Sequence, residues 1–157
     1  MGRRCSPVLD VVLSYIEEIP DRMAVLDALL DLRVRRDDPT KVVTSVLSVT
    51  EVAYAQAEKG AAALDPVVLA RIDDFWADRE AILLAEFHDL IAREARDLIR
   101  SAVAHGWSLR ANDAVHLATA KRLGVAEFHT YDKRLDKYAE IVGFPIVRPR
   151  TLQPRML

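Results

Sequence analysis

Four acidic residues stand where carboxylates often do chemistry in proteins that alternate strands and helices. They are Asp10, Glu51, Asp113 and Asp132. Carboxylates that converge at one edge of a sheet repel one another strongly unless a cation lies among them. Oxygen-only ligand sets suit Mg²⁺ or Mn²⁺, and such ions can activate a water for phosphodiester cleavage. The residue types therefore predict a divalent-metal site at one edge of a sheet.

Each acid also has a purely structural interpretation. Asp113 and Asp132 stand at predicted helix starts, where aspartate is a favoured cap and suits the helix dipole. Glu51 fits the last position of a capping box that begins at Ser48. Asp10 fits an exposed strand end. The metal hypothesis gains weight only because all four acids must be explained at the same edge of one sheet.

The elements that must position these acids alternate between strands and helices. We predict strands over 7–13 (ending near Asp10), 42–46, 81–87, 126–131 and 145–147. We predict helices over 21–35, 48–59, 66–78, 88–104, 112–123 and 133–142, with a polar loop over 35–40. This alternation predicts an α/β sandwich with a largely parallel sheet, in which ligands bind beyond the carboxyl ends of the strands.

Length and composition fit a single domain over residues 1–157. A chain of 157 residues can bury roughly two-thirds of its unfolded surface without a disulfide or a structural metal. Cys5 is the only cysteine, which excludes a disulfide framework and suits a reducing cytoplasm. No apolar run reaches the length of a membrane span, and we expect neither membrane insertion nor a signal peptide.

The charge balance limits how the chain can bind nucleic acid. The formal net charge is −2 and the isoelectric point is about 6.1, whereas a broad basic binding face usually makes a domain more basic. Binding to RNA would therefore rely on local arginines and on metal ions. The candidates are two clusters, Arg33, Arg35 and Arg36, and Arg148, Arg150 and Arg155, although a solvated surface is the simpler interpretation of each.

Three segments together resemble one known family. Residues 42–52 lead to Glu51, residues 108–120 (Ser-Leu-Arg-Ala-Asn-Asp-Ala-Val-His-Leu-Ala-Thr-Ala) contain Asp113, and residues 128–135 (Phe-His-Thr-Tyr-Asp-Lys-Arg-Leu) contain Asp132. In order and spacing they are similar to the acidic motifs of the PIN domain, most closely to the nuclease toxin subunit of VapBC-type toxin–antitoxin pairs. Any one of the segments alone would be weak.

The resemblance implies a three-layer α/β/α sandwich with a central, largely parallel sheet of four or five strands. It implies a Mg²⁺- or Mn²⁺-dependent endoribonuclease that cleaves single-stranded RNA, with Glu51, Asp113 and Asp132, and Asp10 if it reaches them, as metal ligands and catalytic acids. It also implies a cognate antitoxin that covers the site, and a homodimer.

The first acidic motif departs from the family pattern. Asp10 is followed directly by Val11-Val12-Leu13, where the family has small polar residues, and Asp10 lies about two positions late. Three interpretations stay open. The strand is shifted and Asp10 still reaches the metal, Asp10 fills a neighbouring polar position without the main ligand, or the altered start cripples the site. The alternative function is therefore a catalytically weakened PIN-like module that binds RNA or protein.

Other residues have weaker claims to a functional role. Thr44, Ser45 and Thr130 are candidates to hydrogen-bond the carboxylates or a bound water. We expect Asn112 to cap a helix and His116 to pack within it. We expect Trp76 and Trp107 to pack in the core or at a dimer contact rather than to stack on bases. A phosphoacceptor receiver domain is disfavoured, because no lysine stands at the end of the last strands.

Overall fold

The computed structural model describes residues 4–7, 9–31, 41–79 and 82–150. Its strands are β1 (Arg4–Pro7), β2 (Lys41–Ser45), β3 (Ile82–Ala85), β4 (Glu127–His129) and β5 (Ile146–Val147). Its α-helices are α1 (Leu9–Ile16), α2 (Pro20–Asp31), α3 (Leu47–Glu51), α4 (Pro66–Ala77), α5 (Asp89–Ala104), α6 (Ala111–Arg122) and α7 (Ala139–Val142). Two short 3₁₀ helices, η1 (Gln56–Glu58) and η2 (Lys133–Tyr138), complete the set.

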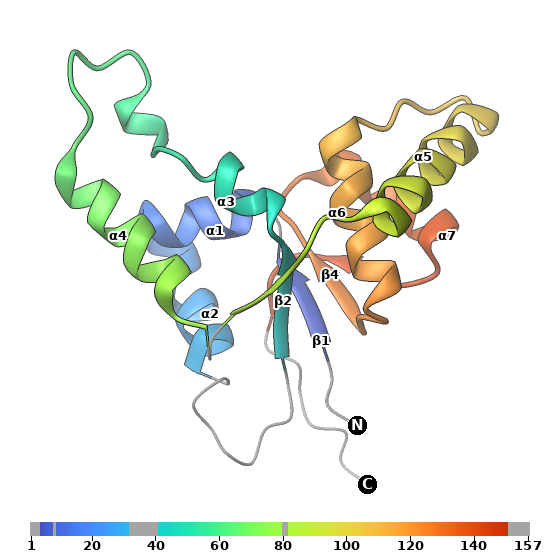
Figure 1. The fold of residues 1–157 in the computed structure, drawn as a ribbon. Coiled ribbons are helices and arrows are strands. Elements are labelled where there is room, and N and C mark those ends of the chain that lie inside the picture. The colour runs from blue at the N-terminus through green and yellow to red at the C-terminus, as the bar shows by residue number, and fades with distance from the viewer. Residues whose placement is uncertain (1–3, 8, 32–40, 80–81, 151–157) are drawn as a thin grey trace, which may run out of the picture.

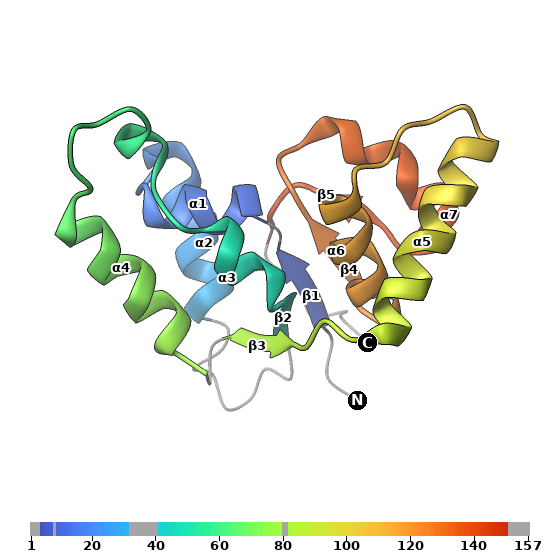
Figure 2. The same ribbon diagram turned by 45° about the horizontal axis from the view of Figure 1, so that its top comes forward.

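The strands form one parallel sheet in the order β3-β2-β1-β4-β5. Helices α1, α2 and α4 lie on one side of it and α5 to α7 on the other, while α3 lies beyond the end of β2 (Figures 1 and 2). The α/β class with parallel strands, predicted from the alternation of elements, is confirmed. Because all strands run the same way, the segments that follow β1, β2 and β4 leave the sheet at one edge.

Successive residues of a strand face opposite layers, and the sheet follows this rule. Val43 of β2 and Phe128 of β4 pack into the large apolar cluster with α5, α6 and α7. Val42, the preceding residue of β2, packs instead with Ile82 and with Phe75 and Trp76 of α4. The hydrophobic alternation of β2 therefore fixes which helices cover which face of the sheet.

The predicted first strand is wrong at its centre. Residues 9–16 form α1, and β1 ends at Pro7, so Asp10 lies in the first turn of a helix. The run Val11-Val12-Leu13 is too short to separate a buried strand from a buried helix by composition alone. Its helical fit comes from Val12 and Ile16, which lie four residues apart and are buried in one cluster.

The helix predicted over 48–59 is also wrong. Helix α3 ends at Glu51, and only a short 3₁₀ turn, η1, follows before α4. By contrast, α4 begins as predicted, with Asp65 accepting a hydrogen bond from the Val67 N–H (2.8 Å) and Pro66 in the first turn. The predicted loop over 35–40 lies outside the described residues.

Candidate active site

Asp10 contacts the segment that follows β4. Its Oδ2 accepts hydrogen bonds from the Thr130 hydroxyl (2.9 Å) and from the Tyr131 N–H (2.7 Å). Its Oδ1 is buried and has no hydrogen-bond partner within the described part of the chain. Burial raises the pKa of the Asp10 carboxyl, and the bonds from Thr130 and Tyr131 oppose that rise. Asp10 therefore reaches the predicted edge from α1 and carries an unsatisfied oxygen there.

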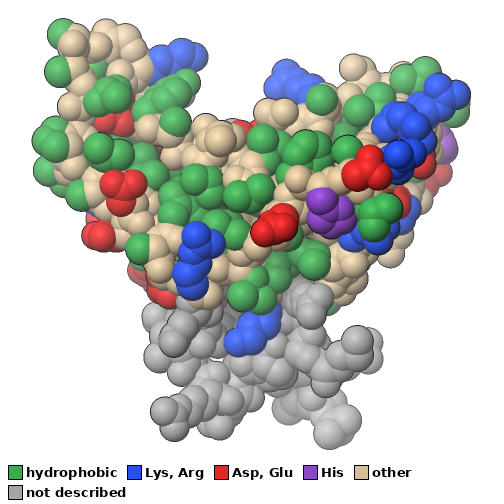
Figure 3. All heavy atoms as spheres, in the orientation of Figure 1, with side chains coloured by type: hydrophobic (Ala, Val, Ile, Leu, Met, Phe, Trp, Pro, Cys, Tyr) green, Lys and Arg blue, Asp and Glu red, His purple; other side chains and the backbone are tan. Residues whose placement is uncertain are grey.

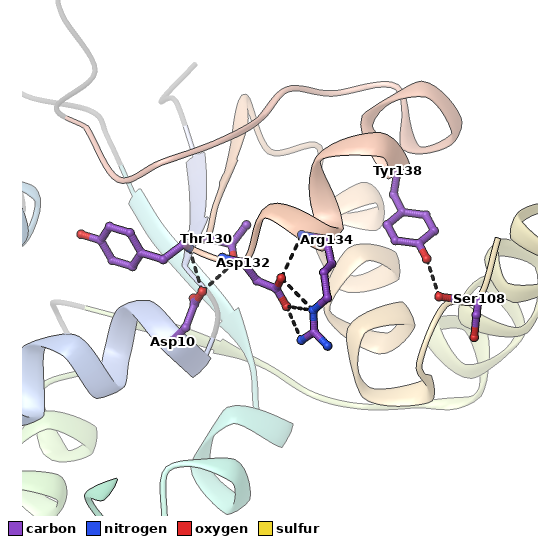
Figure 4. A network of polar contacts seen from close by, with 7 residues as sticks. Asp10, Ser108, Thr130, Asp132, Arg134 and Tyr138 are labelled. Atoms are coloured by element: carbon purple, nitrogen blue, oxygen red, sulfur yellow. Dashed lines mark hydrogen bonds and ion pairs between the residues drawn. The ribbon is translucent and has the colours of Figure 1, made fainter.

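Thr130 joins Asp10 to Asp132. Its fully buried hydroxyl donates to Asp10 and accepts from the Asp132 N–H (3.0 Å), as Figure 4 shows in part. The expectation that Thr130 hydrogen-bonds a carboxylate is confirmed. The other two candidates, Thr44 and Ser45, have contacts where β2 leads into α3. The Thr44 hydroxyl lies 2.9 Å from that of Ser48, and Ser45 Oγ accepts a hydrogen bond from the Leu47 N–H (3.2 Å).

Asp132 caps η2 and pairs with an arginine of the same turn. Its Oδ1 accepts from the Arg134 N–H, and its Oδ2 lies 2.6 Å from Arg134 Nη2 (Figure 4). The hydrogen bonds from Arg134 hold the pKa of the Asp132 carboxyl below its ordinary value. Asp132 therefore has both the capping role that the sequence allows and a charge partner within the protein.

Asp113 lies in the first turn of α6 and is partly buried. Burial raises the pKa of its carboxyl, and the nearby charge of Asp132 raises it further, while His116, Arg110 and Arg134 lower it. Asp113 and Asp132 are thus close enough to repel each other. The Asp113 carboxyl is more costly to ionise than an exposed aspartate.

Glu51 reaches across to α6 and does not close a capping box. Its Oε1 accepts from Asn112 Nδ2 (2.9 Å), and its Oε2 lies 2.6 Å from His116 Nε2. Helix α3 begins after Val46, which makes no side-chain capping bond. The expected capping role of Asn112 is also wrong, because Arg110 is the N-cap of α6. Glu51 is held by two residues that sequence reasoning gave other roles.

Asn112 and His116 were missed although the sequence carried one usable signal. They lie four residues apart on α6 and flank Asp113, so their side chains share one helix face. His116 is also buried, with 4% of its surface exposed, and a buried polar side chain is expected to have a polar partner. The spacing alone does not identify the partner, Glu51, which lies 61 residues from Asn112 and 65 residues from His116 in the chain.

The structure brings the four predicted acids to one region without closing them into one cluster. Thr130 links Asp10 with Asp132, the Asp113 and Asp132 charges interact, and α6 connects Asp113 with Glu51. Within the described ranges, no group of three or more His, Cys, Asp or Glu residues is arranged to hold a metal ion. The residues still fit a cation in kind, because Asp10 carries a buried oxygen without a hydrogen-bond partner among the described residues and burial raises the pKa of the Asp113 carboxyl.

The other predicted residues contact side chains other than the four acids, or lie outside the described residues, although Arg148 contacts the backbone of Thr130. Arg148 pairs with Asp136 and donates to the Thr130 carbonyl, and Arg150 pairs with Glu127. Trp107 stacks on His105 and packs edge-on against Tyr138, while Trp76 packs against Phe75, so both tryptophans make packing contacts as expected. Arg33, Arg35, Arg36 and Arg155 fall outside the described residues.

The helices can be compared with the length and apolar character of a membrane span. Of the helices in the described ranges, none combines the length and apolar character needed to span a bilayer.

The chain matches known proteins in sequence and in structure. The family model described as PIN domain matches residues 10–141. A ribonuclease of Mycobacterium tuberculosis, VapC46, is 36% identical over 86 residues, which cover 53% of this chain and 66% of the relative, slightly under two thirds of its length. The fold is similar to VapBC2 from Rickettsia felis bound to a promoter DNA fragment (TM-score 0.68, 12% identity, 91% and 96% of the two chains covered). It is also similar to VapC20 of Mycobacterium tuberculosis, a sarcin-ricin loop cleaving toxin (TM-score 0.60, 14% identity, 92% and 99% covered).

Proposed function

The chain belongs to the PIN-domain family, and from that premise we propose that it is a divalent-metal-dependent endoribonuclease acting on single-stranded RNA. We propose further that it is the toxin subunit of a VapBC-type toxin–antitoxin pair. The identity to VapC46 supports the ribonuclease activity, and the likeness to toxins solved in VapBC complexes supports the fold that such an activity needs. The proposed architecture is one domain over 1–157, a three-layer α/β/α sandwich around a central sheet of four or five strands.

The observation that carries the proposal is the buried Oδ1 of Asp10, which has no hydrogen-bond partner among the described residues. The partly buried Asp113, whose charge interacts with that of Asp132, adds to it. An ionised carboxylate oxygen that is removed from water and lacks a donor is costly, and a cation is the partner that relieves it. Asp10 and Asp113 would hold the Mg²⁺ or Mn²⁺ ion, with Asp132 and Glu51 beside them. When bound, such an ion lowers the pKa of a water and neutralises charge on the leaving oxygen of a phosphodiester.

The chain's own residues prepare this site for the ion. Thr130 and the Tyr131 N–H fix one oxygen of Asp10 and leave the other free. Arg134 neutralises Asp132, which reduces the repulsion between Asp132 and Asp113 before an ion is bound. No side chain of the site needs to act as a nucleophile, since a water can attack the phosphorus in line.

The partners follow from the same proposal. We expect RNA as substrate, a cognate antitoxin that covers the site, and a cytoplasmic homodimer. The edge strand β3 supports the homodimer, because Leu83 of β3 and the nearby Phe87 and Leu90 are exposed hydrophobic residues. Figure 3 shows hydrophobic side chains across the middle of the face on which β3 lies. Exposed apolar residues on and beside a strand at the edge of the sheet suit a contact with a second copy of the chain.

A second candidate function also has an observation in its favour. Asp10 lies on a helix rather than at a strand end, and within the described residues the acids do not form a ready metal cluster. These facts favour a catalytically weakened module that binds RNA or protein without cutting it. The two candidates differ in one measurable property, which is metal-dependent turnover.

The test is cleavage of a single-stranded RNA pool in Mg²⁺ or Mn²⁺ buffer by wild type, Asp113→Asn and Asp97→Asn. Asp97 is an exposed acid of α5 and serves as a matched control. We expect cleavage by wild type and by the Asp97 variant, with activity lost in EDTA and in the folded Asp113 variant. A wild type that binds RNA without cutting it would favour the binding module. Equal cleavage by wild type and the Asp113 variant would end the enzyme assignment in its present form.

A further inference from the structure

Glu51 is held by a two-pronged contact from α6. Asn112 Nδ2 lies 2.9 Å from Oε1, and His116 Nε2 lies 2.6 Å from Oε2, so each carboxylate oxygen has its own hydrogen-bond partner. We call Asn112 and His116 together the α6 fork.

The fork is well suited to fix the position of Glu51. His116 is only 4% exposed, and the Glu51 side chain is 13% exposed. A hydrogen bond to a charged group is stronger where water is largely excluded. The two donors lie four residues apart, one helical turn, and so grip the carboxylate from the same face of α6. The α6 fork therefore restricts Glu51 far more than a single surface contact would.

The same helical turn also carries Asp113. Asp113 stands between Asn112 and His116 in the sequence and lies in the first turn of α6. One rigid helix thus fixes one acid directly and holds the other through its side chains. Glu51 comes from a different element, the five-residue helix α3 that follows β2.

We propose that Asn112 and His116 are positioning residues. They hold the Glu51 carboxylate at a fixed position relative to Asp113, so that both acids contribute to one divalent-cation site. They are not ligands of the cation themselves. This inference rests on the proposed function, because it concerns the same metal site. It goes beyond the acids by assigning a role to an amide and an imidazole side chain that contact one of them.

A purely structural clamp is the competing explanation. In that case the α6 fork ties α3 to α6, and its loss lowers stability without changing cation binding by the folded protein. Partners that orient ligands from outside the coordination shell typically change metal affinity about 10- to 100-fold when removed. Affinity measured on folded protein therefore separates the two explanations.

The test is calorimetric titration of Mn²⁺ into wild type, His116→Leu, His116→Gln and Asn112→Ala, with folding of each checked by circular dichroism. The leucine removes the donor and keeps an apolar volume, whereas glutamine places an amide donor near the position of Nε2. Lys121→Gln is the control, because Lys121 lies on the same helix and contacts Glu94 instead. Asp113→Asn reports on the metal site itself.

We expect His116→Leu to weaken Mn²⁺ binding at least about 10-fold, His116→Gln to stay within about 3-fold of wild type, and Lys121→Gln to leave it unchanged. Binding by His116→Leu equal to wild type, or a glutamine variant as weak as the leucine variant, would overturn the proposal. If His116→Leu does not fold, the exposed Asn112→Ala decides, with weakened binding in support and wild-type binding against.

Failure of the proposed function gives a different pattern. If wild type and Asp113→Asn titrate alike, the metal site itself is absent, and this inference falls with it. If wild type binds Mn²⁺, Asp113→Asn does not, and both fork variants bind as wild type, the proposed function survives and only the α6 fork loses its role.

Discussion

The four acids of the site fall into two pairs with opposite surroundings. Glu51 and Asp132 are satisfied by the protein itself, the first by Asn112 and His116 and the second by Arg134. Asp10 keeps a buried oxygen without a partner in the described chain, and burial raises the pKa of both Asp10 and Asp113. In the proposed function, Asp10 and Asp113 are therefore the acids that a bound cation would stabilise most, and Glu51 and Asp132 are the acids already stabilised by the protein.

The largest expected effect that separates the two pairs is on RNA cleavage. Asp10→Asn should lower the rate at least about 100-fold, because it removes a group that would hold the cation. Asp132→Asn should lower the rate only about 10-fold, since Arg134 already neutralises that carboxylate. Initial rates on a single-stranded RNA in Mn²⁺ buffer give the comparison. Equal losses in the two variants would remove the distinction between the pairs.

A smaller effect, with opposite signs for the two kinds of acid, is expected in the pH dependence of stability. The raised pKa values of Asp10 and Asp113 increase the free energy of unfolding at low pH. This increase is fully present below the pKa of the unfolded state and is lost as pH rises through the pKa of the folded state. The lowered pKa of Asp132 increases the free energy of unfolding at higher pH. This increase is present above the pKa of the unfolded state and is lost as pH falls through the pKa of the folded state.

Urea unfolding of the metal-free protein between about pH 7 and about pH 2 checks these signs. Relative to the Asp10→Asn, Asp113→Asn double variant, wild type should gain stability as pH falls. Relative to Asp132→Asn, wild type should lose stability over the acidic end of the range. A difference from the double variant that does not change with pH would mean that neither buried carboxyl is perturbed.

The smallest effect is expected for the Arg134 ion pair with Asp132. The Arg134 side chain is 64% exposed, and solvent-exposed ion pairs contribute little to stability. Arg134→Gln should therefore lower the free energy of unfolding no more than Arg93→Gln does in the exposed pair with Asp89 on α5. A clearly larger loss for Arg134→Gln than for Arg93→Gln would place Arg134 in a buried network instead.

Local signals predicted the parts of the molecule that local physics decides. The β-branched run of β2, the cap at Asp65 with Pro66, and the long amphipathic pattern of α5 all match the structure. The segment 9–16 was misassigned because a short apolar run fits a strand or a buried helix equally well. Only its contacts with the rest of the core, such as those of Val12 and Ile16, distinguish the two.

The sequence predicts the acids as site residues, which stays a prediction, but it does not predict the partners that the structure gives them. Asp132 beside Arg134 is a contact between near neighbours, and the Glu51 contacts with Asn112 and His116 join residues more than 60 positions apart. Sequence periodicity contains no information on such pairs beyond the face that each residue occupies. The unpaired oxygen of Asp10 is likewise a property of the folded surroundings, because it depends on burial by α1 and the segment after β4.

The most direct test of the account is calorimetric titration of Mn²⁺ into wild type, Asp10→Asn and Asp113→Asn under identical salt and pH. The account predicts that wild type binds Mn²⁺ and that both variants bind at least about 10-fold more weakly while staying folded. Binding by Asp10→Asn equal to that of wild type would contradict it, because the buried, unpaired oxygen of Asp10 would then take no part in holding the cation.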